Sequence, residues 1–129
     1  MVGMERRYAL LEDNQRCLEE RLGALRERLP GLLQPRVCGA MVIGSVAEGR
    51  ARDDSDLDLL LVLASGDPRR RDYRWWDEEV EPRLGEGSGS RFPVQPLIVA
   101  RRSLGTTEPN LENALRRGVP LWDPEGLFG

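Results

Sequence analysis

Two short motifs between residues 44 and 62 contain the side chains best suited to chemistry. Gly44 and Ser45 follow an apolar segment, and Asp56 and Asp58 open the apolar run that continues to Ala64. Successive side chains of a strand alternate between its faces, so the two aspartates are expected to share one face, about 7 Å apart. Carboxylates placed in this way converge on a divalent cation. Asp56 and Asp58 are therefore candidate ligands of a hard metal ion.

The Gly44–Ser45 pair predicts a site for phosphate. Glycine lets a phosphate approach the backbone, and the Ser45 hydroxyl and the amides of a following short helix can bind phosphate oxygens. Only ten residues separate Ser45 from Asp56, which is short for a parallel crossover containing a helix, so antiparallel strands are expected. Such strands bring the two motifs together. A hard metal, phosphate ligands and no covalent nucleophile indicate phosphoryl or nucleotidyl transfer.

A simpler interpretation of the same residues is a solvated turn that enters a strand. An EF-hand is excluded, because Leu59 and Ser65 occupy the positions of its glycine and glutamate. Two carboxylates opening an apolar central strand are costly to bury without a partner, which favours function. Arg50 and Arg52 flank the motifs, and the sequence favours equally a contact with phosphate and a balance to the neighbouring acids 53 and 54.

Composition excludes several other chemistries. The chain has no His, two Cys and 19 basic residues that are all Arg, so His-dependent catalysis, Cys-rich zinc sites, P-loops and Schiff bases are ruled out. A net charge of -3 gives no general attraction to nucleic acids. With 129 residues, a single domain over 1–129 is expected. No signal peptide or membrane span is expected, so the predicted compartment is the cytoplasm.

The elements that must position these motifs follow from hydrophobic periodicity. A leucine stripe predicts a helix over residues 4–29, ended by Pro30 and Gly31. Segment 37–43 reads as a buried strand, 46–50 as a short helix capped by Ser45, and 57–64 as a central strand. The predicted class is α/β: a small mixed sheet centred on 57–63, with helices packed on it.

The second half of the chain adds helices and an edge strand. Asp67 is the expected N-cap of a helix reaching residue 84, with Tyr73, Trp76 and Val80 on one face. A flexible loop is expected over 85–90. The prolines of segment 92–99 favour an edge strand. A C-terminal helix over 107–117 and an extended segment after Gly118 complete the expected fold.

The segment 44–62 resembles the minimal nucleotidyltransferases (MNT) of the DNA polymerase β superfamily. The likeness rests on the pair Gly44-Ser45, followed after ten residues by Asp56-x-Asp58. Gly49, Ser55 and the apolar residues 59–62 also fit the pattern, and a weaker likeness extends to about residue 122. The resemblance implies that the Gly44–Ser45 turn holds a triphosphate and that Asp56 and Asp58 bind Mg²⁺. A nucleoside monophosphate would then pass from ATP or another NTP to a hydroxyl.

The sequence departs from this family at the third carboxylate that active members carry on the next strand. The matching position falls on Gln95 or Pro96, and no acid occurs between Ser88 and Thr107. A glutamine cannot act as a general base near neutral pH. Weak substitutes are Glu86 and the acids at 53 and 54.

Two functions therefore remain open. One is a Mg²⁺-dependent nucleotidyltransferase acting on a hydroxyl of a protein or small molecule, which the resemblance connects with the antitoxin of a HEPN/MNT pair. The other is a weak or inactive nucleotide-binding module that neutralises a helical partner by binding. The resemblance and the short chain together predict either a helical HEPN-type partner or a homodimer.

Overall fold

The computed structural model describes residues 2–52, 54–84 and 92–128, and the side chains from residue 15 onward. Its centre is a four-stranded sheet in the order β3-β2-β1-β4. β1 (Val37–Ile43) runs antiparallel to both β2 (Leu57–Leu63) and β4 (Val119–Trp122), while β3 (Val94–Val99) runs parallel to β2. The mixed sheet, the antiparallel β1–β2 pair and the edge position of β3 confirm the sequence-based expectations.

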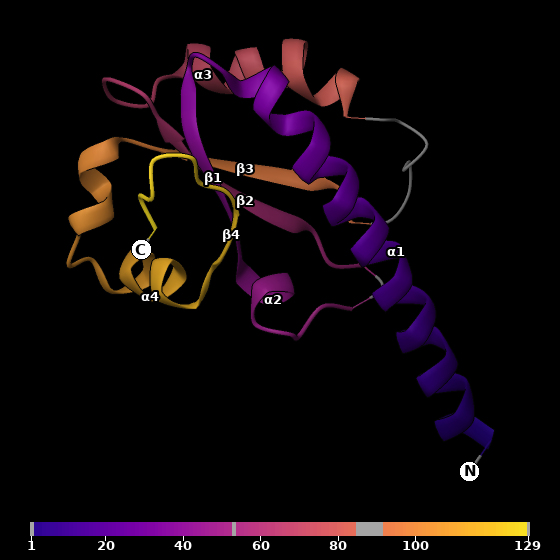
Figure 1. The fold of residues 1–129 in the computed structure, drawn as a ribbon. Coiled ribbons are helices and arrows are strands. Elements are labelled where there is room, and N and C mark those ends of the chain that lie inside the picture. The colour runs from indigo at the N-terminus through magenta and orange to yellow at the C-terminus, as the bar shows by residue number, and fades with distance from the viewer. Residues whose placement is uncertain (1, 53, 85–91, 129) are drawn as a thin grey trace.

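Alternation along β2 divides the core between the two faces of the sheet. Its odd-numbered leucines pack with α1 (Val2–Leu33) and with the helical segments α3 (Arg70–Trp75) and η1 (Trp76–Val80). Leu84, which follows η2 (Glu81–Arg83), belongs to the same cluster. Leu60 and Val62 face the other way, toward η4 (Arg101–Gly105), α4 (Pro109–Arg117) and the C-terminal residues. Figure 1 shows α1 crossing the sheet while its N-terminal end projects beyond it. By the same alternation, Asp58 belongs to the second face.

The C-terminal end of α1 lies beyond the predicted stop. The helix continues through Pro30 and Gly31 to Leu33. Leu29 and Leu33 are both fully buried, and each contributes about 1.5–3 kcal/mol of hydrophobic stabilisation. Leu33 is the leucine that the continued helix adds, and its burial offsets most of the roughly 3 kcal/mol that a proline costs inside a helix.

Two helix starts also differ from expectation. α2 spans Gly44–Ala47 rather than 46–50, and no side chain caps it, so the predicted capping by Ser45 is wrong. α3 begins at Arg70 instead of following Asp67. There the carboxylate of Asp72 accepts a hydrogen bond of 2.8 Å from the Arg69 backbone amide. An acid in the first turn replaces the expected N-cap.

The remaining predicted elements are present with shifted bounds. β3 begins at Val94 rather than 92 and α4 at Pro109 rather than 107, and the single helix expected up to residue 84 is divided into α3, η1 and η2. Trp76 and Val80 are fully buried, and the hydroxyl of the half-buried Tyr73 accepts a hydrogen bond from the Ile98 amide of β3. α4 ends at Gly118, directly before β4. The expected loop 85–90 lies outside the described residues. None of the helices described is long and apolar enough to cross a bilayer.

Candidate nucleotide and metal site

The turn from β1 into α2 lies against the start of β2. Ile43, the last residue of β1, pairs with Asp58. Gly44 has φ +75°, and a Cβ atom placed on it would lie 2.5 Å from Oδ2 of Asp58. Any other residue would strain the backbone and collide with that carboxylate. Gly44 therefore allows a close approach between the turn backbone and the Asp58 side chain.

The turn is held by its own backbone hydrogen bonds. The Glu48 amide donates to the Gly44 carbonyl over 3.1 Å, and the Arg50 amide donates to the Ser45 carbonyl over 2.8 Å. These bonds fold residues 44–50 into one compact loop. Ser45, only partly buried at the start of α2, is thereby fixed close to the β1–β2 end of the sheet.

The two aspartates are close enough for their negative charges to interact. Asp58 is partly buried and Asp56 is exposed. Burial, and then the negative charge of Asp56, raise the pKa of the Asp58 carboxyl above its usual value. A cation placed between these carboxylates would offset both effects.

The donor set fits a hard divalent cation that also binds phosphate. Within the described ranges no group of three His, Cys, Asp or Glu side chains converges on one point, so a metal at Asp56 and Asp58 would need further ligands from water or substrate. Mg²⁺ is commonly held by one or two carboxylates together with substrate phosphates and water. The pair therefore meets the needs of a metal that arrives with a nucleotide.

The β2–β3 register decides which residue lies beside Asp58 on the next strand. Gln95 is the direct parallel partner of Asp58, so their side chains share a face, and Gln95 is exposed. Pro96 pairs instead with Leu59, whose side chain belongs to the core on the opposite face. The position that matches the third carboxylate of the family is therefore Gln95, with its neutral amide, and not Pro96. Of the weak substitutes, Asp54 is exposed, while Asp53 and Glu86 lie outside the described residues.

Arg50 forms an ion pair that the sequence did not suggest. Its Nη2 lies 3.4 Å from Oε1 of Glu48, and the same oxygen is 3.4 Å from Nη1 of Arg117 in α4. The Arg52 amide donates to the Ser55 hydroxyl over 2.7 Å. Glu48 was not singled out in the sequence, because an acid two residues before an arginine is too common a pattern to indicate an ion pair. The contribution of α4 is visible only in three dimensions.

The mixed sheet, with a Gly-Ser turn beside an Asp-x-Asp strand, agrees with the nucleotidyltransferase resemblance of the sequence. A family model for the nucleotidyltransferase domain matches residues 19–86, more than half of the chain. The chain belongs to this nucleotidyltransferase-domain family. The match includes all four motif residues and ends before Gln95.

Among the solved structures similar to the chain are a candidate minimal nucleotidyltransferase and a toxin–antitoxin structure. The candidate minimal nucleotidyltransferase is 36% identical, covers 78% of this chain and 93% of its own, and gives a TM-score of 0.49. The toxin–antitoxin structure with AMP-PNP is 16% identical, covers 80% of this chain and 77% of its own, and gives a TM-score of 0.52. The second likeness shows a shared fold. No curated protein matches the chain.

Proposed function

We propose that this chain transfers a nucleoside monophosphate from ATP to a hydroxyl of a protein or small molecule, as the antitoxin of a HEPN/MNT pair. In this proposal residues 1–129 act as one domain. The observation that carries it is the Asp58 carboxylate lying against the Gly44 backbone, in a chain of the nucleotidyltransferase-domain family. The choice of ATP and of an antitoxin role is supported by the toxin–antitoxin structure with AMP-PNP, which shares the fold.

Each site residue has a distinct part in this proposal. Asp56 and Asp58 would hold Mg²⁺, which when bound offsets phosphate charge and polarises the phosphoryl group under attack. The Ser45 hydroxyl and the α2 amides bind phosphate oxygens, and Gly44 lets this phosphate-binding turn lie against the Asp58 carboxylate. Arg50, held by Glu48, supplies positive charge beside the same turn.

A second candidate function is a nucleotide-binding module that neutralises a helical partner without rapid transfer. The observation that favours it is Gln95 opposite Asp58. Its amide can orient an attacking hydroxyl but cannot accept the proton near neutral pH. Loss of a positioned general base typically slows a reaction about 10²–10⁴-fold. Nucleotide binding rests on the β1–α2 turn and the aspartates, so it is expected to survive.

Two measurements on the same samples test both functions. The chain, alone and with its co-purified partner, is incubated with Mg²⁺ and α-labelled ATP, and nucleotide binding is measured by calorimetry. Label on an acceptor supports transfer, and binding with no label on any acceptor supports the module. Asp58→Asn should abolish metal-dependent binding, whereas Asp54→Asn, which removes an exposed acid from the same loop, should not. If Asp58→Asn binds Mg²⁺–ATP as the wild type does, the site assignment is wrong.

A further inference from the structure

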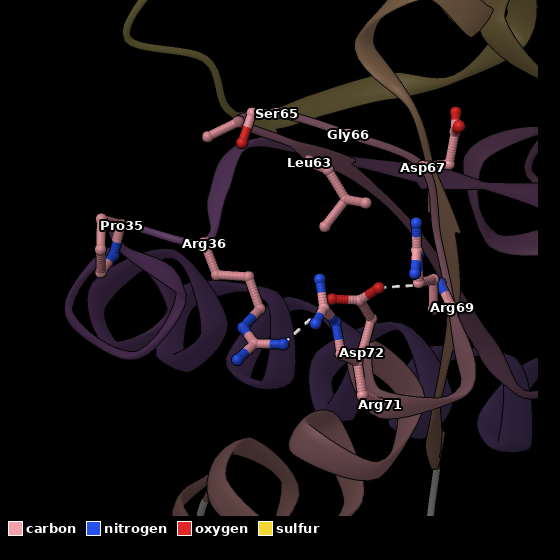
Figure 2. Close-up of a pocket in the computed structure, with 10 residues that line it drawn as sticks. Pro35, Arg36, Leu63, Ser65, Gly66, Asp67, Arg69, Arg71 and Asp72 are labelled. Carbon is pink, nitrogen blue, oxygen red and sulfur yellow. Dashed lines mark hydrogen bonds and ion pairs between the residues drawn. The ribbon is translucent and has the colours of Figure 1, made fainter.

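Figure 2 shows the residues that line a polar pocket of about 290 Å³. Leu63 lines it, so the pocket lies at the other end of β2 from Asp58. Its walls come from residues 35–36 before β1, from the segment 63–67 that leaves β2, and from the start of α3. Leu63 and Leu57 are the two ends of β2, so about 20 Å of strand separates this pocket from the nucleotide site. None of the residues assigned above to nucleotide or metal lines it.

The charges around the pocket are unevenly matched. Three arginines line it: Arg36, Arg69 and Arg71. Arg36 pairs with Asp72 over 3.0 Å, and the other lining acid, Asp67, pairs with Arg102 outside the pocket. Across the described part of the chain, no carboxylate pairs with the side chain of Arg69 or Arg71. Two guanidinium groups therefore border the cavity without a counter-charge.

The pocket wall is held in place by a buried acid. Asp72 is 5% exposed, and its two oxygens accept hydrogen bonds from the Arg36 guanidinium and the Arg69 amide, as Figure 2 shows. The Arg36 guanidinium also lies 4.9 Å from the ring centroid of Trp75. Arg36 is thus fixed by an ion pair and a cation–π contact, and little side-chain entropy is lost when it meets a ligand.

We propose that this pocket binds a small phosphate-class anion, either free phosphate or pyrophosphate or the phosphate group of a monoester. Guanidinium groups bind phosphate through paired, charge-assisted hydrogen bonds. The Ser65 hydroxyl, on the segment that leaves β2, adds a neutral donor. The volume is at the lower limit of ordinary small-molecule sites, which suits a phosphate group better than a whole nucleotide.

Trp75 provides a direct readout, because the arginine stacked on it lines the pocket. The full chain is titrated with inorganic phosphate, pyrophosphate and glycerol phosphate in EDTA, with chloride at equal ionic strength as the blank. Intrinsic fluorescence and calorimetry are recorded together, and Trp75→Phe identifies the reporting ring. Saturable binding is expected, and the tightest of the three probes identifies the source of the phosphate group.

Two matched arginine variants distinguish specific phosphate binding in the pocket from non-specific attraction to positive charge. Arg71→Gln should weaken binding about tenfold or more, because a charge-assisted hydrogen bond is lost. Arg74→Gln removes the same charge from the exposed side of α3, outside the pocket, and should leave affinity within about twofold. Because Arg71 lies at the opposite end of β2 from the Gly44–Ser45 turn, weaker binding in the Arg71 variant places the phosphate in this pocket rather than in the nucleotide site. The proposal is overturned if no saturable binding occurs by about 10 mM phosphate, or if Arg74→Gln weakens it as much as Arg71→Gln.

Discussion

At Asp58 the requirements of stability and of the proposed function oppose each other. Burial, followed by the charge of Asp56, raises the pKa of this carboxyl in the folded chain. A raised pKa means that the folded state holds the proton more tightly than the unfolded state does. The resulting stabilisation is complete below the ordinary value of 3.8 and is lost as pH rises through the raised pKa. At neutral pH without metal, the Asp58 charge therefore works against folding.

Asp58→Asn is expected to stabilise the metal-free chain at pH 7. The gain should be below about 1 kcal/mol, because solvent screens a partly exposed group. Urea unfolding in EDTA measures it, with Asp54→Asn as the control for removing one negative charge from an exposed position. The gain should disappear below pH 3.8 and shrink when Mg²⁺ stabilises the wild type. A less stable Asn variant at pH 7 would contradict this account of the pair.

The neutral residue opposite Asp58 leads to a second prediction. Gln95→Asp places a third carboxylate on the same face as Asp58, so transfer should rise toward the roughly 10²–10⁴-fold that a general base supplies. The rate of label transfer from ATP measures this gain. Pro96→Asp is the matched control, because position 96 pairs with Leu59 and faces the other side of the sheet. If the Pro96 variant gains activity and the Gln95 variant does not, the register argument fails.

Among the elements, α4 supports the second face of the sheet and reaches the nucleotide turn. Its last turn carries Arg117, which shares the Glu48 carboxylate with Arg50. Its C-cap residue, Gly118, packs against β1: a Cβ atom there would collide with Sδ of Met41 and would lie 2.9 Å from the Ala114 carbonyl oxygen. α4 therefore connects the packing on β1 with the loop that carries Arg50.

Gly118→Ala should destabilise the fold by about 1–3 kcal/mol, the usual cost of overpacking. The clash with a flexible methionine can relax, but the close approach to a backbone oxygen cannot do so without moving α4. Gly105→Ala is the matched control, because nothing lies within 4 Å of its Cβ position. Thermal or urea unfolding compares the two variants. Equal stability of the two would show that α4 docks less tightly than the contact distances indicate.

At the scale of the whole molecule, apolar surface is exposed beside the candidate site. Leu97 is 40% exposed on the edge strand β3, two residues after Gln95 and on the same face. Val119 is 47% exposed on the opposite edge strand, β4. Exposed apolar side chains on edge strands are places where another chain can associate.

The chain is expected to act with a second protein, either a helical partner or a copy of itself. Leu97→Asp should weaken association by about 1–3 kcal/mol while leaving Mg²⁺–ATP binding unchanged, and Val119→Asp tests the other edge. Light scattering and pull-down from the native host measure association, and calorimetry measures nucleotide binding. A monomer at high concentration that captures no partner would contradict the prediction.

The sequence alone was sufficient for features that are set locally. The bounds of β1, its antiparallel pairing with β2 and the burial of Trp76 follow from apolar runs, a short connection and helical periodicity. The closeness of the Gly44 turn to Asp58 follows from the same connection, because it is too short for a parallel crossover and antiparallel strands place the end of β1 beside the start of β2.

Tertiary structure decided features that depend on residues distant in sequence. The choice of Gln95 over Pro96 depends on the β2–β3 register, and the continuation of α1 through Pro30 depends on burial of Leu33 against the sheet. The pairing of Glu48 with Arg117 and that of Arg36 with Asp72 join residues that are 69 and 36 positions apart. Local patterns specify the type of each helix or strand and its apolar face, but they contain no information about which distant side chains meet when those faces pack.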